Sequence, residues 1–369
     1  MNTTSLRRTL AGLALTFAMA ISQAQTSFIN YDYMGNADQL VYQDDLKLDA
    51  LEMEGRKILF DKRGGIYVAG TGLSDGEGRD MILLKYTWNG SNFSLVWSYK
   101  YNGPDDGEDI CTGLVLDQYE VPYIAGSSEG DGTGFDLAVI AVNPVNGQKL
   151  WGGDGAARYN SSGSQDDYAY DFAIDSADNL IVAGRTGTSS GNQGLVAVFE
   201  STGSMKTGWP ELYGESGKDE IFYGVTADAD FNVYATGSKA TDSNGTDILV
   251  VRFSGAGSQT HAATVDGTGH EDDEARDIVY TDDAVVVAGF ISQDGPVKQF
   301  AVAAFDDDDL STAEWAGGPV IYDARSEGKA LLFTDGHIYA TGTLFSNPYQ
   351  IGGLGVGRRW GWNSHLANR

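Results

Sequence analysis

A short strand-like run that ends in glycine recurs six times along this chain. The first copy reads Tyr67-Val68-Ala69-Gly70. The copies end at Gly70, Gly126, Gly184, Gly237, Gly289 and Gly342, so that successive glycines lie 56, 58, 53, 52 and 53 residues apart. A fixed period of this length is the sequence signature of an architecture in which one small unit repeats and stacks on the next.

Each copy also contains four strand-like runs, which we name a to d. In the second copy these are residues 110–116, 122–127 and 136–142, with a fourth strand that begins near Leu150. Turn residues separate the runs, and strand c is apolar enough to be buried on both faces. Four strands per repeat predict an all-β fold, a β-propeller of four-stranded blades. A tryptophan follows the glycine by 25 to 27 residues in four copies, and we expect it to pack between blades: Trp97, Trp151, Trp209 and Trp315.

The two ends of the chain predict how the ring closes. The last copy has strands a to c at 330–332, 338–342 and 353–360, but no strand d. The N-terminal segment 28–35 shares the pattern Tyr-x-Tyr-x-Gly with 96–103, a strand d. We therefore predict six blades, with the N-terminal strand completing the C-terminal blade and leaving no open edge. Residues 37–57 form a connection about twelve residues longer than its counterpart, which leaves an insertion or a seventh blade open.

The predicted organisation is a single propeller domain after a leader. Residues 1–24 carry Arg7 and Arg8, an apolar run and small residues at 22–24, which is the pattern of a secretory signal peptide. An uncleaved membrane anchor is the alternative, but the apolar run is shorter than the ~20 residues that a spanning helix needs. Residues 25–369 then form one β-propeller domain. Its repeats lie near 58–113, 114–171, 172–224, 225–277, 278–330, and 331–369 together with 26–36.

Charge and cysteine content limit the partners. The chain has 52 acidic and 24 basic residues, a net charge of −28. Such a charge repels nucleic acid and anionic membrane surfaces, whereas it suits Ca²⁺ or a cationic partner. Cys111 is the single cysteine, so no internal disulfide can form. We expect a bacterial protein that is secreted, periplasmic or on the cell surface, not inserted in a membrane, and monomeric.

The first copy resembles a known repeat family. Residues 61–70 and 80–86, with Trp97 and the Tyr-Asn-Gly-Pro run at 101–104, resemble the bacterial β-propeller repeat called SBBP. The resemblance extends over nearly the whole mature chain but is looser beyond the first copy. Copies four and five lack Tyr-Asn-Gly-Pro, and copy three has Gly194 where strand c of the family begins with aspartate. The resemblance implies a secreted or surface propeller and carries no catalytic residues.

Catalytic motifs are missing from the sequence. The four histidines are scattered and form no metal-binding pair. The Gly-x-Ser-x-Gly runs at 126–130 and 187–191 are not followed by a helix pattern, which a nucleophile elbow needs. We therefore predict no catalytic residue.

Acidic clusters recur where strand d leads into the next strand a. Asp109, Asp167 and Glu220 each lie 17 residues before the glycine of their copy, and Asp273 lies 16 before. Equal spacing predicts equivalent places in the repeats. The b–c loops emerge at the same end of a blade, so we expect one acidic face, the d–a/b–c loop face. Its predicted partner-binding residues are Asp105, Asp106, Glu108, Asp109, Asp166, Asp167, Asp219, Glu220, Asp272 and Asp273.

Two interpretations of these acids remain open. Repeat ancestry alone explains them if each carboxylate caps a turn and adds solubility. Alternatively Asp109, Asp167, Glu220 and Asp273 hold Ca²⁺, which takes six to eight oxygen ligands. The run at 228–232 is closest to a calcium loop, but it lies at an a–b hairpin where a turn role suffices.

The sequence thus favours an exported, non-enzymatic binding or scaffold propeller. Its acidic face would meet a protein or glycan partner, with Ca²⁺ as the candidate cofactor. The alternative is a propeller hydrolase or lyase acting on polysaccharide, which needs paired carboxylates at the channel mouth.

Overall fold

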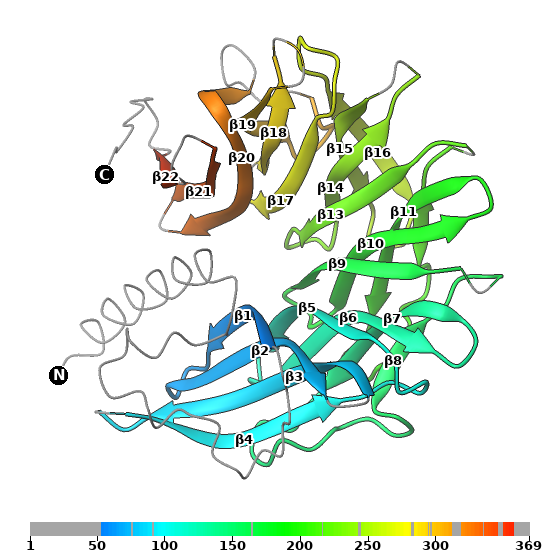
Figure 1. Cartoon of the computed structure of the whole chain (residues 1–369), viewed down its shortest axis with the longest axis vertical. Coiled ribbons are helices and arrows are strands. Elements are labelled where there is room, and N and C mark those ends of the chain that lie inside the picture. The colour runs from blue at the N-terminus through cyan, green and yellow to red at the C-terminus, as the bar shows by residue number, and fades with distance from the viewer. Residues whose placement is uncertain are drawn as a thin grey trace. The chain divides into compact units, whose positions relative to one another are not determined.

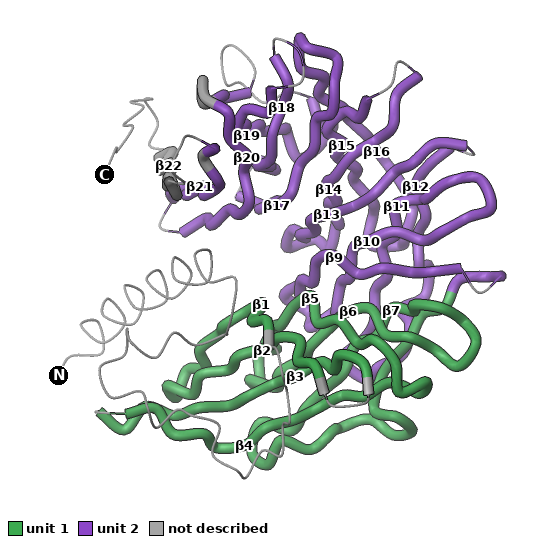
Figure 2. Tube along the Cα trace, in the orientation of Figure 1, with its two compact units in different colours: residues 1–160 green, residues 161–369 purple. Residues whose placement is uncertain are grey.

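The computed structural model describes residues 53–357, except for 75–76, 91, 164, 216, 243–244, 282–283, 294, 296, 312–318, 335 and 346–349. All its regular elements within these residues are β-strands, paired antiparallel in up-and-down order (Figure 1). No membrane-length apolar helix occurs in this part of the chain. The chain separates into two compact units, residues 1–160 and 161–369 (Figure 2). The all-β prediction with four-stranded sheets is confirmed, whereas the single domain stays a prediction.

Unit 1 contains two four-stranded sheets. The first consists of β1 (Met53–Phe60), β2 (Gly65–Ser74), β3 (Glu77–Trp88) and β4 (Phe93–Tyr101). The second consists of β5 (Asp109–Leu116), β6 (Pro122–Gly130), β7 (Gly134–Ala141) and β8 (Ala156–Tyr159).

Unit 2 continues the pattern with two more sheets of four strands and one of six. The third sheet has β9 (Asp167–Ile174), β10 (Leu180–Thr188), β11 (Gly191–Phe199) and β12 (Glu211–Tyr213). The fourth has β13 (Glu220–Ala227), β14 (Val233–Ala240), β15 (Thr246–Phe253) and β16 (Gln259–Val265). The last has β17 (Glu274–Tyr280), β18 (Ala284–Ser292), β19 (Lys298–Asp306), β20 (Val320–Thr334), β21 (His337–Leu344) and β22 (Gln350–Gly357).

The six-stranded sheet joins two repeats through one long strand. Residues 320–325 of β20 pair with β19 as a strand d, and residues 326–334 pair with β21 as the next strand a. The sequence prediction missed this continuity, because it assumed a d–a loop in every copy. The predicted strand d at the N-terminus, within 26–36, lies outside the described residues, as do the signal peptide and Trp315.

A β-bulge at one register explains the repeated glycine. Strand a of every copy has one unpaired residue opposite the junction between the glycine of strand b and the residue before it. The bulge pushes a strand-a carbonyl against that glycine. A Cβ on Gly184, for example, would lie 1.8 Å from the carbonyl oxygen of Tyr168, and the corresponding distance is 1.8 to 2.2 Å at the other five glycines. Only glycine fits beside such a bulge.

The sheets within each unit pack face to face through their apolar residues. In unit 1, Ala69 and Leu83 of the first sheet share a core with Ile124 and Ile140 of the second. Three such cores link the repeats of unit 2 in series. Strand c is largely buried, as its composition predicts: residues 136–141 of β7 are all buried. Strand b is buried at least as fully, and all residues of β18 are buried.

Two of the four predicted packing tryptophans are confirmed as core residues. Trp97 is 8% exposed and its indole Nε1 donates to the carbonyl oxygen of Pro144, 3.2 Å away in the next repeat. Trp209 packs on Phe253, with ring centroids 5.9 Å apart. Trp151 contacts Tyr123 but precedes its strand. The prediction that strand d begins near Leu150 is wrong, because a loop with positive φ at Gly153 and Gly155 delays β8 to Ala156.

An aspartate organises each of four a–b turns: Asp61, Asp117, Asp175 and Asp228. Oδ1 of Asp228 accepts hydrogen bonds from the backbone N–H groups of Asp230 and Asn232, and Oδ2 accepts from the Asn232 side chain. The turn role predicted for this run is therefore confirmed.

Replacing Asp228 with alanine should cost about 2 kcal/mol of unfolding free energy, because bonds from two backbone amides to a charged oxygen are lost. Urea denaturation measures this loss. The matched control is Asp230→Ala in the same turn, whose exposed side chain should change the midpoint little. Equal midpoints for the two variants would contradict the turn role.

Candidate functional site: the acidic ends of strands a, c and d

The four acids of equal spacing occupy one register, as predicted. Asp109, Asp167 and Glu220 lie at the starts of β5, β9 and β13, each two residues before the partner of the repeated glycine. Asp273 holds the same place just before β17. All four are at most 1% exposed. These carboxylates therefore form buried supports of the loops and are not part of the solvent-facing surface.

Each buried acid binds the backbone of its own d–a loop. Asp109 Oδ2 accepts a hydrogen bond from the N–H of Gly103 at 2.6 Å, and Asp167 Oδ2 accepts one from Ser161 at 2.7 Å. Glu220 Oε2 accepts a hydrogen bond from the N–H of Glu215 at 3.3 Å, and Asp273 Oδ2 accepts one from the N–H of Gly267 at 2.5 Å. The carboxylate closes the loop in each copy, which supports the turn-capping interpretation of these positions.

Burial changes the acidity of these groups. Desolvation raises the pKa of Asp109 and of Asp273 to about 6, although hydrogen bonds from backbone amides oppose the shift. Burial also raises the pKa of Glu220. Burial therefore destabilises the anionic forms of Asp109, Glu220 and Asp273.

The acids at the start of strand c are compensated by bases in two repeats. Asp80 of β3 lies 3.0 Å from Lys100 Nζ of β4, and Asp136 of β7 lies 2.9 Å from Arg158 of β8. Both acids are buried, so the bases neutralise charges that would otherwise be costly. Arg158 also donates to the Tyr101 hydroxyl at 2.8 Å.

The third repeat has no acid at this position of strand c. The position was assigned to Gly194 from the sequence, and that assignment is wrong by one residue. The pairing register aligns Gln193, and not Gly194, with Asp80 and Asp136, because Leu195 is the partner of Gly184. The b–c hairpin of this repeat is one residue shorter, and a count along the sequence therefore slips by one.

The fourth repeat keeps the acid of strand c but loses its base. Asp247 of β15 takes the place of Asp80, and Thr264 of β16 takes the place of Lys100. Two residues further on, Asp266 takes the place of Asn102. The cation that balances two other repeats is thus replaced by a neutral residue and a third acid.

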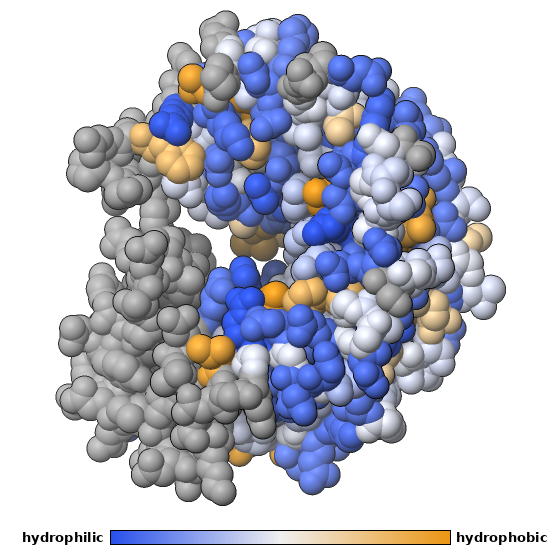
Figure 3. All heavy atoms as spheres, turned by 45° about the vertical axis from the view of Figure 1, so that its right-hand side comes forward, coloured by the Kyte–Doolittle hydropathy of each residue, from blue (hydrophilic) through white to orange (hydrophobic). Residues whose placement is uncertain are grey.

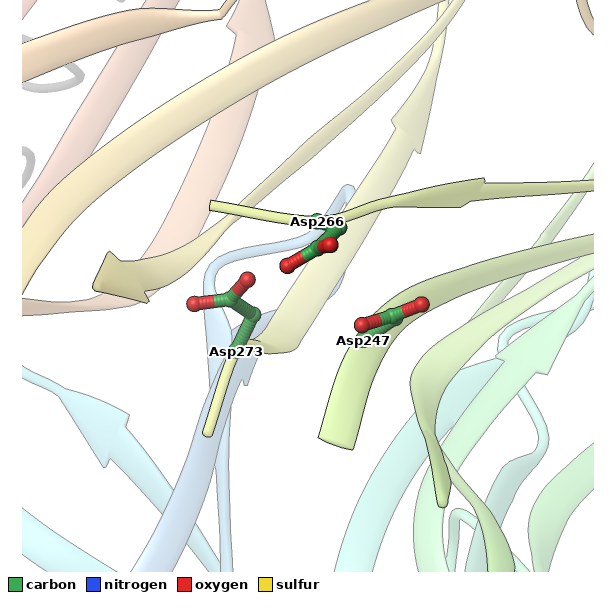
Figure 4. A group of neighbouring side chains, drawn as sticks. All are labelled: Asp247, Asp266 and Asp273. Atoms are coloured by element: carbon green, nitrogen blue, oxygen red, sulfur yellow. The ribbon is translucent and has the colours of Figure 1, made fainter. Parts of the chain in front are cut away.

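Asp247, Asp266 and Asp273 consequently gather at one point (Figure 4). One carboxylate oxygen from each lies within 4.8 Å of the others. Asp273 is buried, Asp247 partly buried and Asp266 exposed, so the group opens toward solvent at one side. The ring nitrogen Nδ1 of exposed His270 lies 2.7 Å from Asp266. Three carboxylates with one open side are a donor set suited to a hard divalent cation such as Ca²⁺.

Of the four residues predicted as calcium ligands, the structure brings only Asp273 into such a group. Within the described residues, Asp109, Asp167 and Glu220 join no cluster of three potential ligands. Sequence reasoning missed Asp266. The available signal was the missing base at Thr264, which becomes visible only once strand d is correctly aligned.

The other predicted face residues differ in exposure. Asp105, Asp106, Asp166, Asp219 and Asp272 are exposed, and Glu108 is partly buried and paired with Arg79. These exposed acids are the ones that a partner can meet. In the view of Figure 3, the described surface is mostly hydrophilic and its apolar residues form small scattered patches.

A second acidic group, Asp306 to Asp308, lies in the turn after β19. The carboxylate of Asp306 accepts from the backbone of Asp308, and that of Asp307 accepts from the Tyr280 hydroxyl at 2.8 Å. Turn formation and one side-chain contact account for these groups.

Comparison with known proteins finds similar solved structures. No family model and no curated protein matches the chain. The β-propeller domain of the Trilobed protease from Pyrococcus furiosus is 7% identical, with a TM-score of 0.45 over 81% of this chain and 84% of that one. A protein of unknown function from Dyadobacter fermentans is 10% identical, with a TM-score of 0.45 over 82% and 93%. An α-L-arabinofuranosidase from Clostridium thermocellum is 10% identical, with a TM-score of 0.35 over 82% and 93%. These similarities assign neither a family nor an activity to this chain.

Proposed function

We propose that this chain is an exported, monomeric β-propeller that acts as a non-enzymatic binding or scaffold protein through its acidic d–a/b–c loops. In this proposal the six bulged repeats correspond to six blades, and the N-terminal segment 26–36 provides strand d of the last blade. The SBBP-like repeat and the signal-like leader favour a secreted, periplasmic or surface location. A protein or glycan is the partner class, reached through the exposed acids of the loops.

The proposal that this protein binds Ca²⁺ rests on Thr264, a neutral residue at the position where two other repeats have a base. Where Lys100 and Arg158 neutralise a buried acid, the fourth repeat offers Asp247, Asp266 and Asp273 instead. A divalent cation would restore the balance that its sister repeats obtain from a side chain. Asp273 already uses both oxygens as acceptors for backbone amides, from Gly267 and Ser292, and still has lone pairs for a metal.

Calcium should therefore raise the thermal stability of the mature protein. For a dissociation constant of about 0.1 mM, as in weak extracellular sites, 1 mM Ca²⁺ adds about 1.4 kcal/mol to the unfolding free energy. Differential scanning calorimetry at pH 7.5, in EDTA and then with Ca²⁺, measures the rise in Tm. The rise should shrink at pH 5, because burial raises the pKa of Asp273 to about 6 and protons then compete with the metal.

Two variants separate this site from general charge screening. Asp266→Asn should remove the calcium effect, since it takes one charged ligand from the group. Asp131→Asn, an exposed acid of another b–c loop, should leave the effect intact. An unchanged Tm with calcium, or an equal rise in the Asp266 variant, would refute the cation site.

The polysaccharide hydrolase alternative has weaker support at this group. A general acid needs an oxygen that presents its proton to the substrate. Burial raises the pKa of both Asp247 and Asp273, and Asp273 directs its two oxygens to the amides of Gly267 and Ser292. Its bonding pattern therefore favours a structural or metal-binding role.

A further inference from the structure

The unpaired residue of the strand-a bulge is a repeated position whose side chain varies. The bulge recurs in every copy with the strand-b glycine opposite it, whereas the bulged residue itself changes. In chain order this position is occupied by Arg56, Thr112, Tyr170, Tyr223, Arg276 and Lys329. A bulge re-aims its side chain and is common beside functional sites. Constant supports around a variable side chain are what a ligand-binding row requires.

In unit 2 the first part of this row is aromatic. The rings of Tyr170 and Tyr223, from β9 and β13, have centroids 5.3 Å apart. Tyr168 stacks on Tyr170 at 6.5 Å with an interplanar angle of 11°. The guanidinium of Arg185 lies 4.6 Å above the Tyr168 ring and donates to the Tyr170 hydroxyl at 3.0 Å. Both bulge tyrosines are only partly buried, so the rings retain open surface.

The second part of the row is cationic. The Arg276 guanidinium lies 4.7 Å from the Tyr223 ring centroid and pairs with Glu274. Lys329 Nζ lies 2.8 Å from Glu327, and Lys298 Nζ lies 3.9 Å from the same glutamate. The side chains of Arg276, Lys298 and Lys329 are 35%, 37% and 47% exposed. Strands β9, β13, β17 and β20, which carry the row, follow one another as packed neighbours (Figure 1).

Bases and acids are balanced in this segment, unlike in the chain as a whole. Three bases, Arg276, Lys298 and Lys329, lie among three acids, Glu274, Asp277 and Glu327, in a protein of net charge −28. Burial raises the pKa of Glu274, and the nearby bases oppose that rise. Solubility alone would not place three cations beside two partly exposed aromatic rings.

We propose that Tyr170, Tyr223, Arg276 and Lys329 form a binding site for an acidic saccharide, a uronate-type oligosaccharide. A pyranose ring offers an apolar C–H face that packs on a tyrosine ring, while its hydroxyls bond to acceptors such as Glu274 and Glu327. Its carboxylate suits the planar, bidentate guanidinium of Arg276 and the point charge of Lys329. A row of rings followed by cations fits an extended chain better than a small anion. This assignment goes beyond the acidic-loop function and uses different residues.

Isothermal titration calorimetry of the mature protein with trigalacturonic acid tests the site. We expect saturable binding that weakens as salt rises, and at least tenfold weaker binding to maltotriose, a neutral trisaccharide. Tyr223→Ala and Arg276→Gln should each weaken trigalacturonate binding at least about tenfold. Lys329→Gln, which alters a half-exposed side chain and keeps the fold, should weaken it about threefold or more.

The control and the contrary outcomes are equally specific. Arg63→Gln replaces an arginine that is 90% exposed on the β1–β2 turn, and it should leave binding unchanged. Urea midpoints of all variants confirm that they are folded. The proposal is overturned if trigalacturonate gives no saturable heat, if maltotriose binds equally well, or if the folded Lys329 and Arg276 variants bind as tightly as the parent. Binding of citrate with the affinity of trigalacturonate would also overturn it, in favour of a simple anion site.

Discussion

Gly184→Ala should destabilise the protein by about 3 kcal/mol, near the upper end for overpacking a well-packed interior. The added Cβ would lie 1.8 Å from the carbonyl oxygen of Tyr168, a backbone atom that the bulge holds in place. The strand cannot yield without losing the pairing on both sides of the bulge, between Ala169 and Asp171. For a unit of this size the loss corresponds to a fall in Tm of roughly 6 °C or more.

The matched control lies three residues away in the same strand. A Cβ on Gly187 would meet its nearest atom, Cβ of Gln165, at 3.4 Å, which is ordinary contact. Gly187→Ala should therefore change the urea midpoint little or raise it slightly, since alanine has less freedom than glycine in the unfolded chain. Similar losses in both variants would mean that the glycine signature reflects something other than the bulge.

The glycine repeat made the spacing of the repeats predictable, yet the bulges themselves were not predicted. An isolated glycine in a strand pattern does indicate a bulge or a close backbone approach. The extra residue, however, lies on strand a, 13 or 14 residues before the glycine, and it has no characteristic residue type: Arg56, Thr112 and Tyr170 share no chemistry. Only the two-against-one pairing register reveals that they are equivalent.

Strand ends were less predictable than strand cores for a related reason. Strand c is apolar along its length because it is buried on both faces, so its position could be identified from composition. Strand d is exposed and short in some repeats, three residues in β12 and four in β8, and it carries little pattern. Trp151 therefore misled the assignment, since it belongs to the loop that precedes the strand.

The candidate site was likewise predictable in part: the positions of its residues could be predicted, but their burial and their grouping could not. Equal spacing to the glycine correctly placed Asp109, Asp167, Glu220 and Asp273 at equivalent positions. It could not show that they are buried, because a count of charges along a loop does not distinguish a carboxylate that faces solvent from one that caps the backbone beneath. The group of Asp247, Asp266 and Asp273 comes from three separate strand ends, and only tertiary pairing brings these together.

The buried acids also imply that the metal-free protein loses stability as pH rises from about 4 to 6. Burial raises the pKa of Asp109 and of Asp273 from 3.8 to about 6. Between pH 3.8 and about 6 the folded state holds protons that the unfolded chain has released. The free energy of unfolding therefore falls as pH rises through this range. Each residue accounts for a loss of about 3 kcal/mol that is complete above pH 6. Asp309 and Glu327, whose pKa values are lowered, act in the opposite direction, because they stabilise the fold at high pH and lose that effect as pH falls.

Asparagine variants isolate the contribution of each buried acid from this background. Asp109→Asn keeps an oxygen that accepts the Gly103 amide and removes the charge, so its unfolding free energy should fall less than that of the parent between pH 4 and 6. Above pH 6 the variant should be the more stable protein in EDTA. Asp273→Asn should behave in the same way without metal, but calcium at pH 7.5 should stabilise the parent and the Asp109 variant and leave the Asp273 variant unchanged. Urea denaturation at half-unit pH intervals measures all three proteins. A parent and variants with the same pH slope would show that these carboxylates titrate normally in the folded state, and the charge imbalance that favours a cation at Asp273 would then be absent.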